Sequence, residues 1–358
     1  MQTDDSLFSH IALSLSGGGI RAVGFHLGTL DCLQRVGLLE KVHILSSVSG
    51  GSLVGTSYAL SQQMGRDFQH CFDNLYDFLP RLNTLEEVFS QLSGDAAAFP
   101  SGRRDMITSM ANVFHEEYYS RYYEVTDFGV FWEDSDTHLK EIVFNATEFK
   151  TGTAFRFQKS QLPSRIGNGH VSIREEHARQ MRMGDVMAAS CCIPVGMEPL
   201  FFPWDFHWQD DSDPARPTCS AVARHITEQT GDNSVAIMDG GVYDNQGLSS
   251  VMLAMVRRDH ARDGEDGLVA REPVSAEGWG QWMKRILKAG NNTRDGGVTE
   301  EGVDLAPLDL FIISDTPLRP ATLYPNEAPP EPAPEPGFFG RRTLGQYNRL
   351  AQFITVLL

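Results

Sequence analysis

Two short apolar runs near the start of the chain, Ile11–Leu15 and Val42–Val48, have the length and composition of buried strands. Each run ends in a turn rich in glycine, and apolar residues at helical spacing follow each turn. The first predicted helix extends from Ile20 to Val36, and the second from Ser52 to Leu60. Two strand–turn–helix units in succession predict a parallel sheet that is covered by helices.

The rest of the chain continues this pattern with one interruption. Further strands are predicted at Glu141–Phe149, Ala154–Gln158, Val235–Met238 and Leu308–Ser314, with a helix at Leu248–Val256 and a polar loop at 257–277. Residues 62–134 are helical in character, rich in aromatic residues and broken by proline and glycine, so we expect an inserted helical cap there. The predicted fold is α/β, a three-layer α/β/α sandwich with a mainly parallel central sheet.

The C-terminal part of the chain has a different composition. Residues 325–336 are dense in proline and glutamate, which predicts an extended linker over residues 321–340. Apolar residues then recur at helical spacing and predict an amphipathic helix over residues 341–358. Docking on the chain's own core is the commonest fate of such a helix, while binding to a partner or a membrane surface stays open.

Composition excludes several classes of protein. The chain has 358 residues, of which 41% are hydrophobic, and this is enough to bury a large core. A net charge of −17 and the lack of a Lys/Arg cluster argue against nucleic acid as a partner. The same charge argues against adsorption to anionic membranes, so any contact with lipid would depend on local apolar surface.

Cysteine usage and the chain start give expectations about metals and location. The five cysteines are scattered without C-x-x-C spacing, which predicts neither a zinc site nor a disulfide framework. The N-terminus lacks the positive charge and apolar run of a signal peptide, and no apolar stretch is long enough to span a membrane. We therefore expect a cytoplasmic protein, with secretion by another route left open.

The turn after the second strand, Ser47-Val48-Ser49-Gly50-Gly51, has the features of a nucleophile elbow. In such an elbow a serine occupies a strained turn, and small neighbours allow the strand and the next helix to approach closely. The usual motif is G-x-S-x-G, and Ser47 stands here in place of its first glycine. Taken alone the motif is weak, because ordinary turns often contain serine and glycine.

A second candidate is the loop Ser16-Gly17-Gly18-Gly19-Ile20-Arg21, between the first strand and its helix. Backbone N–H groups of such a loop, together with the positive end of the helix, bind a phosphate or an oxyanion. A tight turn that needs positive φ would use the same glycines. Arg21 would either orient the loop or lie solvated in the first helical turn.

The third candidate, Asp239, directly follows a predicted apolar strand and precedes Gly240 and Gly241. Open α/β sheets bind ligands at the carboxyl ends of their strands, and paired glycines leave room for another side chain to approach. A turn-forming aspartate that bonds to its own backbone would produce the same pattern.

In this order, the three segments resemble the patatin-like phospholipase family. The resemblance rests on G-G-G-x-R at Gly17–Arg21, on the serine elbow, and on D-G-G at Asp239–Gly241. A fourth segment, Ala188–Pro194, is similar to the A-S-x-A-x-P helix end that often precedes a stretch rich in phenylalanine and proline. The resemblance covers roughly Ile11 to Ser250, and the expected catalytic domain occupies residues 1–320, with the cap at 62–134 inserted.

The resemblance implies a lipid acyl hydrolase with a Ser–Asp dyad and no histidine between the two residues. Ser49 would be the nucleophile and Asp239 the general base, and the acyl group would pass to Ser49 and then to water. No metal or other cofactor is implied. The N–H groups of Gly18, Gly19 and Gly50 would form the oxyanion hole, supported by Gly17, Arg21, Gly51, Gly240 and Gly241, with Arg21 bracing the loop. Ala22 departs from the family pattern, which often has a glycine there.

The implied substrate is a carboxylic ester of a phospholipid or related acyl lipid, reached by transient contact with a membrane surface. An acyltransferase or a regulated lipid-binding effector on the same fold is the alternative. A Ser-His-Asp hydrolase would have to use His260, the only histidine after Asp239 in the sequence. A nucleotide-binding module is disfavoured because its glycine patterns are absent. A homo-oligomer and a regulatory partner stay open.

Two further features have a functional and a structural interpretation. His26 would assist an anion site or, more commonly, be a packed or capping histidine. Aromatic residues gather in the cap, where they would gate an acyl tunnel, touch a bilayer or, as the favoured interpretation, pack in a core. They are Phe114, Tyr118, Tyr119, Tyr122, Tyr123, Phe128, Phe131 and Trp132.

Overall fold

The computed structural model describes residues 8–81, 84–93, 98–162, 166–194, 196–262 and 308–316. These residues form a sheet whose main path runs in the order β6-β5-β4-β3-β2-β1-β9, with β8 and β7 branching from β3. Four consecutive strands of this path are parallel to one another: β3 (Glu141–Glu148), β2 (Val42–Val48), β1 (Ile11–Leu15) and β9 (Leu310–Ser314). The predicted α/β class with a parallel central sheet is confirmed.

Antiparallel strands extend this parallel centre. They are β4 (Thr153–Ser160), β5 (Ile166–Gly167), β6 (Ser172–Ile173), β7 (Leu200–Phe202) and β8 (Val235–Asp239). The link between β3 and β4 is too short for a crossover helix, so these two strands can pair only in opposite directions.

One edge of β3 is shared by two strands that approach from opposite directions. The register of β2 along β3 ends with Val48 opposite Asn145, while that of β8 ends with Asp239 opposite Ala146. The other edge of β3 pairs with β4 over its whole length. The carboxyl ends of β2 and β8 therefore meet at adjacent positions of β3.

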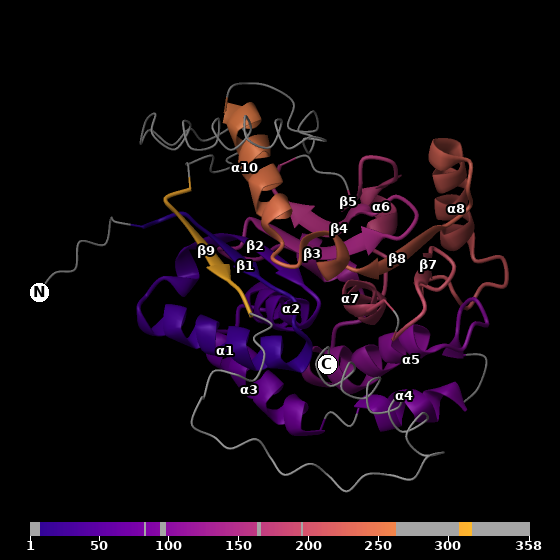
Figure 1. Cartoon of the computed structure of the whole chain (residues 1–358), viewed down its shortest axis with the longest axis horizontal. Helices are drawn as coiled ribbons and strands as arrows, with labels where there is room; N and C mark the ends of the chain where they lie inside the picture. The colour runs from indigo at the N-terminus through magenta and orange to yellow at the C-terminus, as the bar shows by residue number, and fades with distance from the viewer. Residues whose placement is uncertain are drawn as a thin grey trace, which may run out of the picture.

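Helices cover both faces of the sheet (Figure 1). On one face lie α1 (Gly19–Arg35), α2 (Gly50–Gln63) and α7 (Met183–Cys191), and on the other α10 (Leu248–Arg262). The remaining helical elements are η1 (Leu39–Lys41), α3 (Phe68–Phe78), η2 (Leu79–Arg81), α4 (Thr84–Leu92), α5 (Met106–Val113), η4 (Phe114–Tyr123), η5 (Phe128–Trp132), α6 (Glu175–Ala178), α8 (Pro217–Thr230) and α9 (Gly241–Asp244).

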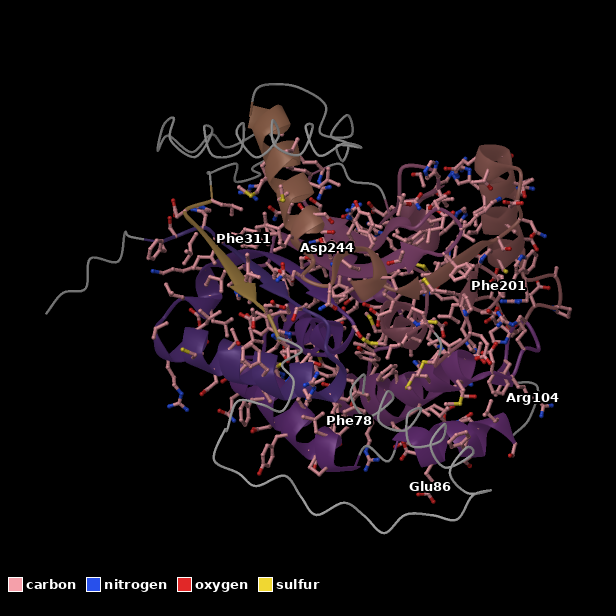
Figure 2. The ribbon with its side chains drawn as sticks, viewed as in Figure 1. Phe78, Glu86, Arg104, Phe201, Asp244 and Phe311 are labelled. Atoms are coloured by element: carbon pink, nitrogen blue, oxygen red, sulfur yellow. The ribbon has the colours of Figure 1, made fainter. Side chains whose placement is uncertain are left out.

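The segment predicted as a cap is helical and shares one hydrophobic core with the sheet. Phe78 of α3, labelled in Figure 2, packs against Tyr118 of the π-helix η4 with their ring centroids 4.4 Å apart. Of the aromatic residues singled out in the sequence, Phe114, Tyr118, Tyr119, Tyr123, Phe128 and Phe131 are buried. This burial agrees with the core-packing interpretation and leaves those six rings no surface for a bilayer.

The predicted polar loop at 257–277 is wrong at its start, because residues 257–262 continue α10. Arg257 and Arg258, at the start of this predicted loop, are both buried. Arg257 forms an ion pair with Glu141, a buried carboxylate on the face of β3 that α10 covers. The charged residue Arg257 can thus lie within a buried part of α10, because Glu141 of the sheet supplies a negative charge. The linker at 321–340 and the helix at 341–358 lie outside the described residues.

Candidate functional site

The site lies where β2 and β8 meet along β3. Ser49 directly follows the last residue of β2, and Asp239 is the last residue of β8. Because the two strands end at adjacent positions of β3, their terminal side chains come together although they are far apart in sequence. Ser49 is 5% exposed and Asp239 is 7% exposed, so both groups are largely shielded from water.

Ser49 has the strained backbone expected of a nucleophile elbow. Its φ is 53° and its ψ is −124°, a combination that only a tightly held turn maintains in a residue with a side chain. A β-carbon on Gly51 would lie within 3.0 Å of the Ser16 carbonyl oxygen, and one on Gly50 equally close to that of Gly19. Both glycines are needed because the elbow and the glycine loop are in direct backbone contact.

The surroundings of Asp239 change the basicity of its carboxylate. Burial raises the pKa of its carboxyl to about 6, while a backbone hydrogen bond from Gly241 and a side-chain hydrogen bond from Ser49 oppose this rise. The Gly241 N–H donates to Oδ1 at 2.7 Å and fixes the orientation of the carboxylate. A carboxylate with this pKa is ionised at neutral pH and is a stronger base than an exposed aspartate.

The glycine loop adopts backbone angles that favour glycine. Gly18 has φ of 150° and Gly19 of 62°, and the Gly17 N–H donates to the Asn245 carbonyl at 2.9 Å. The N–H groups of Gly18, Gly19 and Gly50 form no hydrogen bond with any residue that the structure describes. Gly19 begins α1 and Gly50 begins α2, so two helix N-termini, each with partial positive charge, lie side by side here.

The other supporting residues differ in what they contact. A β-carbon on Gly240 would lie within 3.0 Å of the Asn145 carbonyl oxygen, so glycine allows the turn after β8 to press against β3. The Arg21 side chain is exposed and forms no hydrogen bond or ion pair with the described part of the chain. Its suggested role in bracing the loop therefore stays a prediction.

Ser190, in the last turn of α7, supports the elbow in a way that the sequence did not reveal. Its hydroxyl donates to the Asn145 carbonyl at 2.7 Å and accepts the Ser49 main-chain N–H at 3.1 Å. The Ser52 hydroxyl lies 2.8 Å away, and it must donate to Ser190 because the one proton of Ser190 is already used. The elbow is thereby tied to β3 and α7.

Asn145 continues this network into the sheet. Its amide donates to the Ser46 hydroxyl and to the Ser47 carbonyl, both at 2.9 Å. Its Oδ1 accepts from the Ser250 hydroxyl at 2.5 Å, and Ser250 in turn accepts from Arg156 at 2.7 Å. The sequence held one signal of this network, which is the polar residue Asn145 within a predicted apolar strand. A buried amide needs hydrogen-bond partners, so its presence indicates a polar network nearby.

His26 lies behind the glycine loop and is a packed residue. Its Nε2 donates to the Ser16 carbonyl at 2.8 Å, and its Nδ1 accepts from the Ser314 hydroxyl at 2.7 Å. Burial lowers its pKa to about 4, so the ring is neutral at physiological pH. The histidine links α1, the loop and β9, which agrees with the structural interpretation.

The Cys191 thiol donates to Met187 Sδ at 3.7 Å, and it lies close enough to Ser49 and Asp239 for both to influence its pKa. Burial raises the pKa of this thiol well above its ordinary value, with the nearby Asp239 charge acting in the same direction. The group stays a protonated thiol, which is a poor nucleophile. Within the described residues, no cluster of histidine, cysteine, aspartate and glutamate could hold a metal ion.

Comparison of the sequence with known protein families finds a match to one of them. The family model described as "Patatin-like phospholipase" matches residues 13–252, which include all three glycine-containing segments of the site. No curated protein matches the chain. Among the helices that the structure describes, none is both long enough and apolar enough to cross a membrane.

Proposed function

This chain belongs to the patatin-like phospholipase family, and we propose that it hydrolyses carboxylic esters of phospholipids or related acyl lipids through a Ser49–Asp239 dyad. The observation that carries the proposal is that Ser49 and Asp239, both buried, follow and end two strands that meet at adjacent positions of β3, where burial raises the pKa of the Asp239 carboxyl to about 6. Such a pair supplies a nucleophile and its base.

In the first half-reaction, the Asp239 carboxylate takes the proton of the Ser49 hydroxyl as its oxygen attacks the ester carbonyl. The carbonyl π electrons move to oxygen, and the N–H groups of Gly18, Gly19 and Gly50 stabilise the resulting oxyanion. When the intermediate collapses, the bond to the alcohol oxygen breaks and Asp239 returns the proton to it. The alcohol leaves, and the acyl group remains on Ser49.

The second half-reaction repeats these steps with water. Asp239 takes a proton from water, the hydroxide oxygen attacks the acyl carbonyl, and the same N–H groups stabilise the charge. Collapse breaks the bond to Ser49, which recovers its proton from Asp239. The products are a carboxylic acid and the free enzyme, and no redox partner is required.

Contact with the lipid surface would involve exposed apolar side chains beside the site. Ile20, which follows Gly19, is 38% exposed, and Val242, which follows Gly241, is 49% exposed. Because the chain is strongly acidic, charge opposes its binding to an anionic surface, and local apolar contact is the available means of binding lipid. Replacing both by serine is expected to lower the ratio of vesicle hydrolysis to hydrolysis of a dissolved short-chain ester.

The proposal is tested by measuring fatty-acid release from mixed phospholipid vesicles. Ser49→Ala and Asp239→Asn are each expected to reduce release by about 10²- to 10⁴-fold with the fold intact. Asp232→Asn is the matched control, because Asp232 is exposed and precedes the other end of β8. Release that persists in either dyad variant would exclude the assignment. Labelling by a fluorophosphonate probe, lost only in Ser49→Ala, would identify the nucleophile independently.

A further inference from the structure

Asn245 occupies the space between the two glycine turns of the site. A β-carbon added to Gly17 would lie within 3.0 Å of Asn245 Oδ1, and one added to Gly241 would be equally close to the same atom. The β-carbon added to Gly17 would also lie 3.4 Å from the Ser49 β-carbon. The one added to Gly241 would lie 2.9 Å from Asp239 Oδ1. The amide of Asn245 therefore lies beside both members of the dyad.

The backbone around Asn245 is held firmly, so its side chain has a fixed starting point. Its carbonyl accepts the Gly17 N–H at 2.9 Å. The carboxylate of the preceding residue, Asp244, accepts a hydrogen bond from the Ser249 N–H at 2.7 Å. This bond joins α9 to the start of α10, and Asp244 is labelled near that point in Figure 2.

The side-chain amide of Asn245 is available to bind a ligand. Asn245 is exposed, and neither Oδ1 nor Nδ2 forms a hydrogen bond with a residue that the structure describes. A primary amide carries two N–H donors and one carbonyl acceptor. At Asn245 these groups lie beside the loop that flanks Ser49 and the turn that carries Asp239.

The mechanism identifies which part of the substrate comes closest. The alcohol oxygen must receive its proton from Asp239, so the leaving group has to lie on the Asp239 side of Ser49. Asn245 contacts the turn that carries Asp239 and the loop that flanks Ser49. We propose that Asn245 binds the alcohol portion of the substrate and selects esters whose alcohol carries hydrogen-bond acceptors, such as a glycerophosphate. This inference rests on the proposed acyl hydrolase activity.

The expected effect is on selectivity between alcohols. An amide N–H that donates to a phosphate or glycerol oxygen gains a charge-assisted or neutral hydrogen bond, whereas a p-nitrophenyl alcohol offers no oxygen at the equivalent position. The parameter kcat/KM reports acylation, the step in which the alcohol is still attached, and deacylation is common to both esters. The ratio of kcat/KM between two esters of the same acid isolates this contact.

The experiment measures kcat/KM for a phospholipid and a p-nitrophenyl ester with the same acyl chain, both in the same detergent micelles. Asn245→Ala is expected to lower the phospholipid to p-nitrophenyl ratio about tenfold or more. Asn245→Gln keeps the amide and is expected to recover part of that ratio. Asn233→Ala, an exposed asparagine ahead of the other end of β8, is the control and should leave the ratio at its native value.

A ratio in Asn245→Ala equal to that of the native protein would overturn the inference. Partial unfolding does not disturb the comparison, because both esters report on the same population of folded enzyme. Failure of the proposed activity has a different signature, in which the native protein hydrolyses neither ester and fluorophosphonate does not label Ser49.

Discussion

Gly50 and Gly19 are in such close backbone contact that a β-carbon on Gly50 would lie within 3.0 Å of the Gly19 carbonyl oxygen. Gly50→Ala must therefore separate the start of α2 from the start of α1. If the N–H groups at these two helix ends hold the oxyanion, kcat should fall by about 10²- to 10³-fold, as measured by fatty-acid release.

Gly24→Ala is the matched control for this substitution. Gly24 lies within α1, and a β-carbon there would have no neighbour within 4 Å. Alanine should raise the free energy of unfolding by about 0.5–1 kcal/mol and preserve the rate. Equal losses of activity in the two variants would contradict the oxyanion role of this contact.

The pH dependence of kcat/KM follows from the environment of Asp239. Burial raises the pKa of its carboxyl to about 6, and only the ionised form accepts the Ser49 proton. Activity should therefore be low at acid pH, rise as the pH passes through about 6, and level off above it. Repeating the profile at two temperatures identifies the group, since the ionisation of a carboxyl depends little on temperature and that of an imidazole strongly. A marked shift on warming would indicate a histidine base.

The same carboxyl should lower stability at neutral pH. The folded pKa is raised from 3.8 to about 6, so the folded state holds this proton more tightly than the unfolded state. That stabilisation is present below pH 3.8 and is lost as the pH rises through about 6. Asp239→Asn should gain stability relative to the native protein over this range, by up to about 3 kcal/mol.

Urea unfolding of both proteins near pH 4 and near pH 8 measures this gain, because all other titrating groups are common to the pair. An advantage of Asp239→Asn that shrinks as the pH rises would mean that the folded protein favours the ionised carboxylate.

Ser190→Ala tests the support beneath the elbow. The substitution leaves the buried Ser49 N–H and the Asn145 carbonyl without their common partner, which should cost about 1–3 kcal/mol of stability. The rate at which fluorophosphonate labels Ser49 should also fall, since the strained turn loses a constraint. Ser109→Ala is the control, because the Ser109 hydroxyl is buried without a hydrogen-bond partner among the described residues. Labelling at the native rate in Ser190→Ala would show that the strand and helix alone hold the turn.

Local patterns were sufficient for the elements that begin the fold. The predicted strands Ile11–Leu15 and Val42–Val48 match β1 and β2, because each is an apolar run bounded by turn residues. Helix ends were less accurate, and α2 extends from Gly50 to Gln63. Polarity misled the prediction at Arg257, whose charge is buried against Glu141, a partner that no local pattern identifies.

The site was predicted as a set of residues, while its internal support was not. Ser49, Asp239 and the glycines lie in turns with recognisable sequence patterns, and the structure brings them together. Ser190 and Asn145 act through contacts between distant strands and helices, which the order of residues does not encode locally. No role was predicted for Asn245 from the sequence, because its closeness to Gly17 depends on the three-dimensional path of the chain.

The meeting of β2 and β8 along one edge of β3 has a consequence for how this protein can vary. The spacing of Ser49 and Asp239 is set by one peptide unit of β3, from Asn145 to Ala146, and by no connecting loop. Insertions, deletions or exchanged segments between these anchor points leave that spacing unchanged as long as the three strands keep their register. Sequence drift in intervening segments that do not contact the site can thus remodel what the protein recognises while the spacing of Ser49 and Asp239 is kept.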